Sequence, residues 1–277
     1  MNRIITEICV GAAVPFSLLH VSDTHLPLVD ERDDERKMRL ANRRRGNFPT
    51  AEADFYEVLR IAEQEKKTVV HTGDLIDFIS EKNLDMAREF TRRADVFMVA
   101  GNHEFSLYVG EAVEDAAYRA QSLDKVQAAF KNPIRFASRV VNGVNLVAID
   151  NSYYLFEEWQ LAALKDEVKK GLPILLFMHN PLYTEEYYEF SIRGKEKGTP
   201  AYLVAVPEEK MSDYSEKRFA QQRADAPTVE TVEYIKSQPL IRGVFVGHIH
   251  REFEAPLSST AAQFATGMQT VREIKIR

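Results

Sequence analysis

Short apolar runs alternate with amphipathic stretches through the first part of the chain. After Thr50, which can cap a helix, apolar residues recur at the i, i+3, i+4 and i+7 spacing of one helix face. Strands are predicted at residues 3–10, 16–21, 68–71 and 96–100, and helices at 50–66 and 84–93. Two strand–helix–strand units in succession predict parallel strands joined by right-handed crossovers.

A hairpin pattern sets the middle of the chain apart. Two β-rich runs at residues 134–141 and 144–150 are joined by Asn142-Gly143, which favours a tight two-residue turn. Because an antiparallel hairpin departs from a purely parallel sheet, we expect a second sheet packed on the first. Further helices are expected at 111–130, 157–170 and 229–236, and further strands at 173–178, 244–246, 263–265 and 271–276. No repeat or linker is visible, which favours one domain over residues 1–277.

Two segments lack sustained periodicity. Residues 26–47 are highly charged, and we expect a surface excursion that shapes access to a site. The basic cluster Arg43-Arg44-Arg45 follows several acidic residues there and is interpreted as a solvated charged loop. Residues 183–226 are rich in Tyr, Glu, Lys and Arg, and so long a segment without clear elements predicts a cap or lid insertion.

Composition narrows the class of protein. A chain of 277 residues with 45% hydrophobic content is enough for a packed core. The formal charge of −6 argues against a protein that binds duplex nucleic acid. The only cysteine, Cys9, excludes an intrachain disulfide and a thiolate cluster, so any metal must be held by oxygen and nitrogen. No apolar run reaches the ~18 residues of a membrane span. Because Glu7 interrupts the apolar N-terminus and Arg3 is its only early cation, we expect a cytoplasmic protein rather than a secreted one.

Five of the apolar runs end in groups that are costly to bury without a partner. These groups are Asp23 and His25 after residues 16–21, Asp74 after 68–71, Asn102, His103 and Glu104 after 96–100, His179 after 173–178, and His248 and His250 after 244–246. Carboxylate, amide and imidazole groups delivered by strand ends are the layout of a metal site on an α/β sheet.

The donor set exceeds the needs of one ion. The candidate ligands are Asp23, His25, Asp74, Asn102, His179, His248 and His250. Two ions that share the carboxylate of Asp74 would use them all, and a pair about 3.5–4 Å apart can activate water for displacement at phosphorus. Mixed nitrogen and oxygen donors suit Mn²⁺, Fe, Zn²⁺, Co²⁺ or Ni²⁺ better than Ca²⁺, and the sequence does not choose among them.

The motif series Asp23-x-His25, Gly73-Asp74, Gly101-Asn102-His103-Glu104, His179 and Gly247-His248-x-His250 resembles the calcineurin-like metallophosphoesterase superfamily. All five blocks occur in the family's order, from residue 16 to about 252. The resemblance implies an α/β fold: a four-layer α/β/β/α sandwich of two mixed sheets flanked by helices. Asp77 stands where purple acid phosphatases have a tyrosine ligand, and no Asp-Arg-Gly segment follows Asp74 as in protein serine/threonine phosphatases. The chain is more similar to the small bacterial phosphohydrolases and phosphodiesterases.

The resemblance also implies roles for the residues. Asp23, His25, Asp74 and His250 would hold one ion, and Asp74, Asn102, His179 and His248 the other. His103 would protonate the leaving oxygen while a metal-bridging hydroxide attacks, and Glu104 would orient and charge His103. His20 and His71 lie inside strands and are interpreted as structural, with His71 nearer the site. Asp77 is interpreted as a turn or cap residue.

The predicted function is therefore hydrolysis of a small phosphomonoester or phosphodiester by a two-metal enzyme. A nuclease stays open within this class, although the acidic charge disfavours it. A non-enzymatic, metal-bound interaction module is the alternative from another class, and the complete ligand set argues against it. The substrate, the native metal and the oligomeric state are left open.

Overall fold

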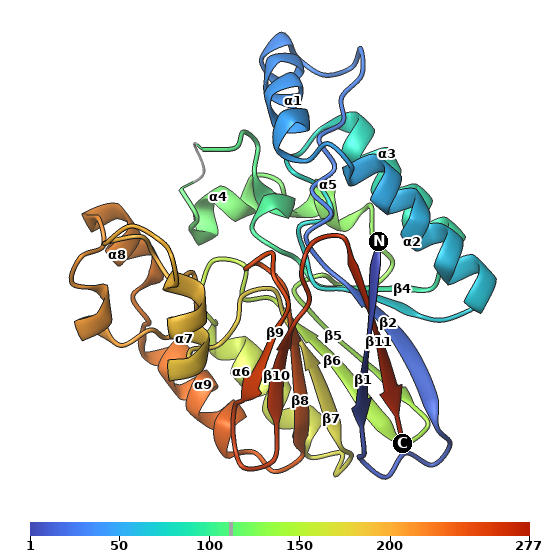
Figure 1. The fold of residues 1–277 in the computed structure, drawn as a ribbon, viewed down its shortest axis with the longest axis vertical. Helices are drawn as coiled ribbons and strands as arrows, with labels where there is room; N and C mark the ends of the chain where they lie inside the picture. Colours follow the sequence, from blue (N-terminus) through green and yellow to red (C-terminus); the bar gives the residue numbers. More distant parts are fainter. Residues whose placement is uncertain (111–112) are drawn as a thin grey trace.

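Two mixed β-sheets form the centre of the molecule (Figure 1). The computed structural model describes residues 1–110 and 113–277. The five-stranded sheet has the order β1 (Asn2–Ile8), β11 (Thr270–Ile276), β2 (Phe16–Val21), β3 (Val69–His71) and β4 (Val96–Met98). The six-stranded sheet has the order β5 (Phe136–Val141), β6 (Val144–Ile149), β7 (Ile174–Phe177), β8 (Ile241–Val246), β10 (Ala262–Ala265) and β9 (Phe253–Pro256).

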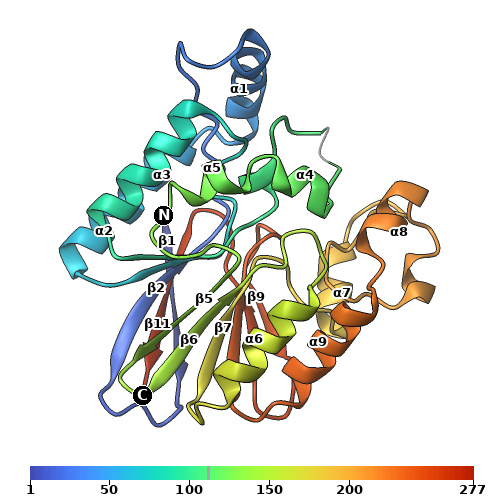
Figure 2. The same ribbon diagram turned by 180° about the vertical axis from the view of Figure 1, so that it is seen from behind.

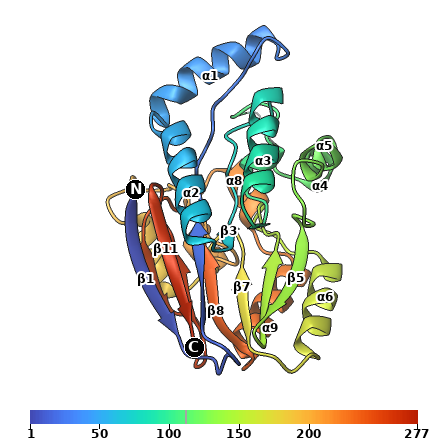
Figure 3. The same cartoon turned by 90° about the vertical axis from the view of Figure 1, so that its right-hand side faces the viewer.

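Helices cover the outer faces of both sheets (Figures 2 and 3). Phe55 of α2 (Ala51–Glu65) and Phe90 of α3 (Glu81–Arg93) pack in one buried cluster with the outer face of the five-stranded sheet. Leu164 of α6 (Glu158–Val168) and Ile235 of α9 (Ala226–Ser237) do the same on the six-stranded sheet. A third cluster, which includes Phe97, Phe177 and Phe245, fills the space between the sheets. The predicted four-layer α/β/β/α sandwich is confirmed.

The two-residue turn and the amphipathic helices form where the sequence places them. Asn142 and Gly143 both adopt positive φ, 49° and 82°, and join β5 to its antiparallel neighbour β6. Helix α2 buries its predicted apolar face, yet Thr50 makes no capping bond, because its hydroxyl donates to the Asp54 carboxylate instead. The helix position was therefore predictable, although its cap was not.

The charged and irregular segments contain more helix than their patterns predict. Helix α1 (Glu35–Asn47) occupies much of the expected surface excursion and buries only Leu40 and Ala41. The 183–226 segment contains α7 (Glu185–Ile192), the 3₁₀ turn η2 (Glu208–Met211) and α8 (Glu216–Gln222). The helical region predicted at 111–130 forms two short helices, α4 (Ala116–Ala120) and α5 (Leu123–Gln127), and its residues 111 and 112 lie outside the described residues. No helix of the described chain has the length and apolar character needed to cross a bilayer.

Strand direction determines where the site lies. Strands β2, β3 and β4 are parallel, so Val21, His71 and Met98 lie side by side at their carboxyl ends. Strands β7 and β8 are also parallel, with Phe177 beside Phe245. The loops that follow these five strands carry all the candidate ligands and meet at one end of the sandwich.

Candidate metal centre

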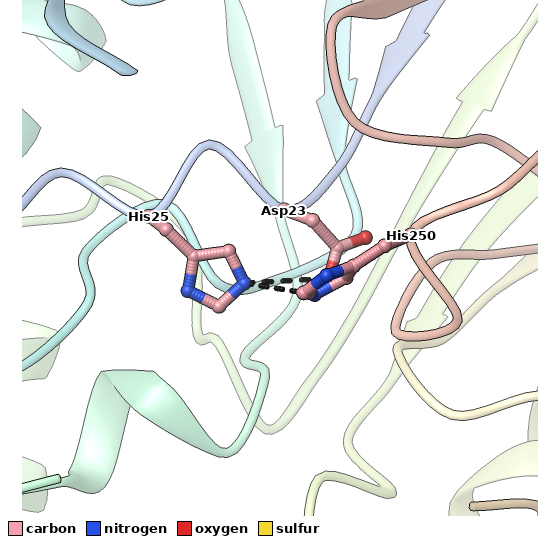
Figure 4. Close-up of side chains that lie close together, drawn as sticks. All are labelled: Asp23, His25 and His250. Carbon is pink, nitrogen blue, oxygen red and sulfur yellow. Dashed lines mark hydrogen bonds and ion pairs between the residues drawn. The ribbon is translucent and has the colours of Figure 1, made fainter. Parts of the chain in front are cut away.

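The loop after β2 and the loop after β8 bring together a first group of donors, Asp23, His25 and His250 (Figure 4). The Nε2 atoms of His25 and His250 are 3.1 Å apart. Oδ1 of Asp23 lies 3.4 Å from Nε2 of His250 and 3.9 Å from Nε2 of His25. Three facing donor atoms at these distances form a cradle of the size that one ion fills.

A second group lies beside the first and consists of Asp74, His179 and His248. Nε2 of His179 is 3.2 Å from Oδ2 of Asp74 and 3.0 Å from Nδ1 of His248. The same Oδ2 atom of Asp74 is 3.6 Å from Nε2 of His25 in the first group. Asp74 therefore lies between the two groups, in the position that a shared ligand needs.

Asn102 has the one unpaired oxygen among the candidate ligands. Its side-chain Oδ1 is buried and has no hydrogen-bond partner among the described residues, whereas its Nδ2 lies 3.5 Å from the Glu114 carboxylate. A buried acceptor without a partner is rare because its desolvation is not compensated. A cation beside Oδ1 would compensate it, so this atom fits a metal ligand.

One ring nitrogen is already held on three of the four candidate imidazoles. Nδ1 of His25 contacts Asp77 Oδ1 at 3.0 Å, and Nδ1 of His179 donates to the Thr72 carbonyl at 2.6 Å. Nε2 of His248 contacts the Tyr154 hydroxyl at 2.9 Å. Such contacts fix the ring and direct the other nitrogen at the site, as in protein metal centres generally. No pattern in the sequence indicates the contribution of Tyr154, which depends on a contact 94 residues away.

Burial and charge determine how the imidazoles titrate. Burial lowers the pKa of His25 and lowers that of His248 well below its usual value, so both rings are in the neutral form that binds metal. Burial opposes charge on His179 too, but the Asp74 carboxylate raises its pKa to about 9. Metal binding would therefore displace a proton from His179.

The backbone is strained at most of the candidate ligands. Asp23, His25, Asp74, His248 and His250 have φ between 51° and 66°, a region that residues other than glycine rarely occupy. Such conformations cost about 1–3 kcal/mol each and persist where the surroundings impose them, often at functional sites. All five of these residues contribute a side chain to the donor groups.

Two motif glycines allow the ligand loops to approach. A Cβ atom on Gly101 would lie 2.6 Å from the Asp74 backbone nitrogen, and one on Gly247 would lie 2.5 Å from Oδ2 of Asp23. Both distances are shorter than real Cβ contacts, so any larger residue would displace these carboxylates. The close approach of the backbone at these two positions to Asp74 and Asp23 therefore explains why both residues are glycine.

His103 lies beside the donors, with its ring in an edge contact with His25. Its Nδ1 donates to the Asp77 carbonyl oxygen at 2.6 Å and lies 3.2 Å from Oδ1 of the same residue. Burial opposes a charge on this ring, but the carboxylates of Asp74 and Asp77 outweigh burial and raise its pKa to about 10. His103 also borders the cavity described below.

The expected pairing of Glu104 with His103 is wrong. The Glu104 carboxylate accepts hydrogen bonds from the backbone nitrogens of Gly101 and Asp74 at 2.7 Å and of Leu75 at 2.8 Å. A fully buried carboxylate needs several donors, and these backbone groups supply them. Glu104 therefore joins the loops after β3 and β4, and Asp77 takes the place expected beside His103.

Asp77 is the central contact that sequence reasoning missed. Besides His25 and His103, its carboxylate accepts two hydrogen bonds from Arg44, at 2.6 and 2.7 Å. Phe48, just after α1, stacks on His25 with a centroid distance of 4.3 Å. Arg44 is therefore not part of a solvated loop, and the charged segment supports His25 from outside the site.

We expect Asp77→Asn to weaken metal binding about 10–100-fold, because the neutral side chain no longer orients and polarises His25. Calorimetric titration of the metal-stripped variant with Mn²⁺ measures the change. Asp166→Asn is the control, since Asp166 lies on the exposed face of α6 and pairs with Lys169. Equal affinities in the wild type and Asp77→Asn would show that Asp77 has no influence on the ligands.

The two remaining histidines have structural contacts. His20 is buried between the hydroxyls of Thr72 and Thr266, at 2.8 Å from each. His71 contacts the Thr24 hydroxyl at 3.0 Å, and its Nδ1 accepts from the Gly73 nitrogen at 3.2 Å. Neither residue belongs to a donor group among the described residues, and His71 supports the loop that carries Asp74.

A cavity of about 440 Å³ opens in front of the donors. Asp74, Asn102, His248 and His250 border it. Residues of the 183–226 segment border it as well, among them Tyr202. A volume in this range matches small-molecule sites.

The sequence model of one family, described as calcineurin-like phosphoesterase, matches residues 16–252. That interval contains every candidate ligand together with His103. No curated protein shows a significant sequence match to the chain.

Among solved structures, a dimetal phosphatase from Danio rerio is 14% identical with a TM-score of 0.48, over 92% of this chain and 88% of that protein. The phosphopantetheinyl hydrolase from Mycobacterium tuberculosis is 11% identical with a TM-score of 0.45, over 94% and 90%. A putative 5'-nucleotidase from Staphylococcus aureus is 12% identical with a TM-score of 0.44, and the match covers 92% of this chain but 49% of that protein. Similarity this distant says nothing about the substrate of this chain.

Proposed function

Because the chain belongs to the calcineurin-like phosphoesterase family, we propose that it hydrolyses a small phosphate ester with two divalent metal ions. The observation that carries the proposal is the position of Asp74. Its Oδ2 atom lies within 3.6 Å of an imidazole nitrogen from each donor group. A single carboxylate shared in this way is what a pair of adjacent ions requires.

The two ions have distinct ligand sets in this proposal. The first ion would be held by Asp23, His25, Asp74 and His250, and the second by Asp74, Asn102, His179 and His248. The unpaired oxygen of Asn102 and the oriented imidazoles support this assignment. When bound, the ions would supply Lewis-acid stabilisation of the phosphoryl oxygens and would acidify a water molecule. Mn²⁺, Fe, Zn²⁺, Co²⁺ and Ni²⁺ all suit such mixed donors.

His103 is the proposed general acid. Because a carbonyl oxygen only accepts, the contact with Asp77 places a proton on Nδ1, and the raised pKa places a second proton on Nε2. Nε2 can then protonate the leaving oxygen of an ester in the cavity. Bound cations would offset part of the effect of Asp74 and bring this pKa down toward the neutral range, which suits a general acid.

The segment at 183–226 is proposed to act as a cap on the site, within a single domain. Its residues border the same cavity as the donors, so they would exclude part of the bulk water and limit the substrate to a small molecule. Whether that molecule is a monoester or a diester depends on the space between the donors and this segment.

Removal of metal is the test of the proposed function. The chelator-treated protein is expected to lose turnover of phosphate esters and to regain it when a divalent ion is returned. The interaction-module alternative predicts no turnover with any metal, even when the ions are bound.

A further inference from the structure

The cap segment brings three cations to the cavity of a chain whose net charge is −6. Lys195 follows α7, and Lys217 and Arg218 lie on α8. All three border the same cavity as the metal donors Asp74 and His248. Positive side chains and metal donors therefore line one cavity.

Two of these cations have no carboxylate partner among the residues that the structure describes. Among the described residues, neither Lys195 nor Lys217 makes an ion pair. Lys197, two positions from Lys195, has its ammonium 3.1 Å from the Asp213 carboxylate and lies outside the cavity. The solvent-facing lysine of the segment therefore has a carboxylate partner, whereas the cavity lysine has none among the described residues.

Tyr202 connects the cations to the metal donors. Its ring makes an edge contact with His248 at a centroid distance of 5.7 Å. The ammonium of Lys195 and the guanidinium carbon of Arg218 each lie 5.5 Å from the centre of the same ring. Tyr202 has a φ of 58°, a costly conformation for a tyrosine, so its position at the cavity is imposed by the surrounding structure.

Glu114 anchors α8 beside the metal donors. Its carboxylate accepts from Gln221 and lies 3.5 Å from both the Arg218 guanidinium and the Asn102 amide. Glu114 therefore links the helix that carries two of the three cations to a candidate ligand. Because Glu114 offsets part of the Arg218 charge, Lys195 and Lys217 provide the uncompensated charge of this surface.

We propose that this group of cations, Lys195, Lys217 and Arg218, binds a second anionic group on the leaving group of the substrate. The substrate class is then a phosphate ester whose leaving portion carries a carboxylate or a further phosphate. The ester phosphorus lies at the metal centre, and the second anion lies near Lys195 and Lys217, across the ring of Tyr202. This inference rests on the proposed function for the identity of the first group.

Non-hydrolysable phosphonates test the second site separately from turnover. The probes are alkylphosphonates of increasing chain length with a terminal carboxylate, each matched to its neutral carboxamide, plus bisphosphonates of the same lengths. Calorimetry on the Mn²⁺-loaded protein gives their affinities. At the length that spans the cavity, the carboxylate is expected to bind at least about tenfold more tightly than its amide, as a charge-assisted contact requires. Tighter binding of the bisphosphonate would identify a second phosphate as the preferred group.

Variants separate this site from general charge effects. In the double variant Lys195→Gln/Lys217→Gln, the carboxylate is expected to lose its advantage, whereas the affinity of the matched carboxamide stays within about twofold. Lys197→Gln, which removes a neighbouring charge already paired with Asp213, is expected to keep the full preference. Equal binding of acid and amide at every length overturns the proposal, and so does a preference that survives in the double variant. Anion preference without turnover of any ester would contradict the proposed hydrolysis and leave the second site standing.

Discussion

Asp74→Asn is expected to lower turnover about a thousandfold or more, since loss of a charge shared by two ions removes several kcal/mol of stabilisation. The substitution keeps the shape of the side chain, so the surrounding packing changes little. The Oδ2 atom of Asp74 lies within 3.6 Å of His25 and His179, and an amide at this position would bring no negative charge for two cations to share. Metal analysis of the purified variant is expected to show less than the wild-type metal content.

Asp85→Asn is the control for this experiment. Asp85 lies on α3, and its carboxylate pairs with Arg32 and Arg88 at the surface, away from the donors. Thermal unfolding of both variants excludes loss of the fold as the cause of lost activity. Wild-type turnover and metal content in Asp74→Asn would contradict the bridging role.

His103→Ala is expected to lower turnover about 10²–10⁴-fold for esters with poor leaving groups, because no other group then supplies the proton. The loss should be smaller for 4-nitrophenyl phosphate, whose leaving group departs as the anion. Asp74 and Asp77 raise the pKa of His103, so its proton is present at neutral pH and is lost as the pH rises; bound cations that offset Asp74 would move this loss to a lower pH than in the metal-free protein. The wild-type rate with an alkyl ester is therefore expected to fall in alkaline solution.

The same comparison shows what His103 does. Rates for alkyl, phenyl and 4-nitrophenyl esters measure the dependence on leaving group in both proteins. A steeper dependence in His103→Ala, together with loss of the alkaline fall, supports general acid catalysis. Equal losses for all three esters would contradict it and would indicate a role in binding or in holding His25.

The strand ends were predictable because they are local features of the sequence. An apolar run followed by Asp23 or by His248 needs no knowledge of distant contacts, and parallel strands bring such ends to one edge. The structure brings six of the seven candidate ligands into two adjacent donor groups, a third group of His25, Asp74 and His103 overlaps both, and the oxygen of the seventh candidate, Asn102, is buried without a partner. The hairpin at Asn142-Gly143 indicated a second sheet packed on the first, whereas the four-layer order came from the resemblance to the calcineurin-like family.

The supporting contacts were not predictable because they join distant positions. Arg44 reaches Asp77 across 33 residues, and Tyr154 reaches His248 across 94. The family resemblance implied a pairing of Glu104 with His103, but the buried Glu104 carboxylate instead accepts hydrogen bonds from four backbone nitrogens. A buried carboxylate requires several donors, and backbone groups from two loops supply them here.

Helix α1 shows the same limit at the level of the fold. Its thirteen residues bury Leu40 and Ala41 and expose a largely charged surface, so no sustained apolar spacing marks it as a helix. Its stability depends on the Asp34 cap, which accepts from the Lys37 nitrogen, and on contacts such as that of Arg44 with Asp77. The spacing of apolar residues indicates neither the helix cap nor these tertiary contacts.

The most direct test of the two-metal mechanism is a metal titration of the chelator-stripped protein, with bound metal and turnover measured on the same samples. Mn²⁺, Zn²⁺, Fe²⁺, Co²⁺ or Ni²⁺ is added in steps, with 4-nitrophenyl phosphate and bis-4-nitrophenyl phosphate as the monoester and diester. A two-metal mechanism predicts that turnover of at least one ester rises only as the second ion per chain binds. The ester that turns over faster identifies the preferred class of substrate. A protein that binds two ions and hydrolyses neither ester, or that reaches full turnover with one ion, would contradict this mechanism.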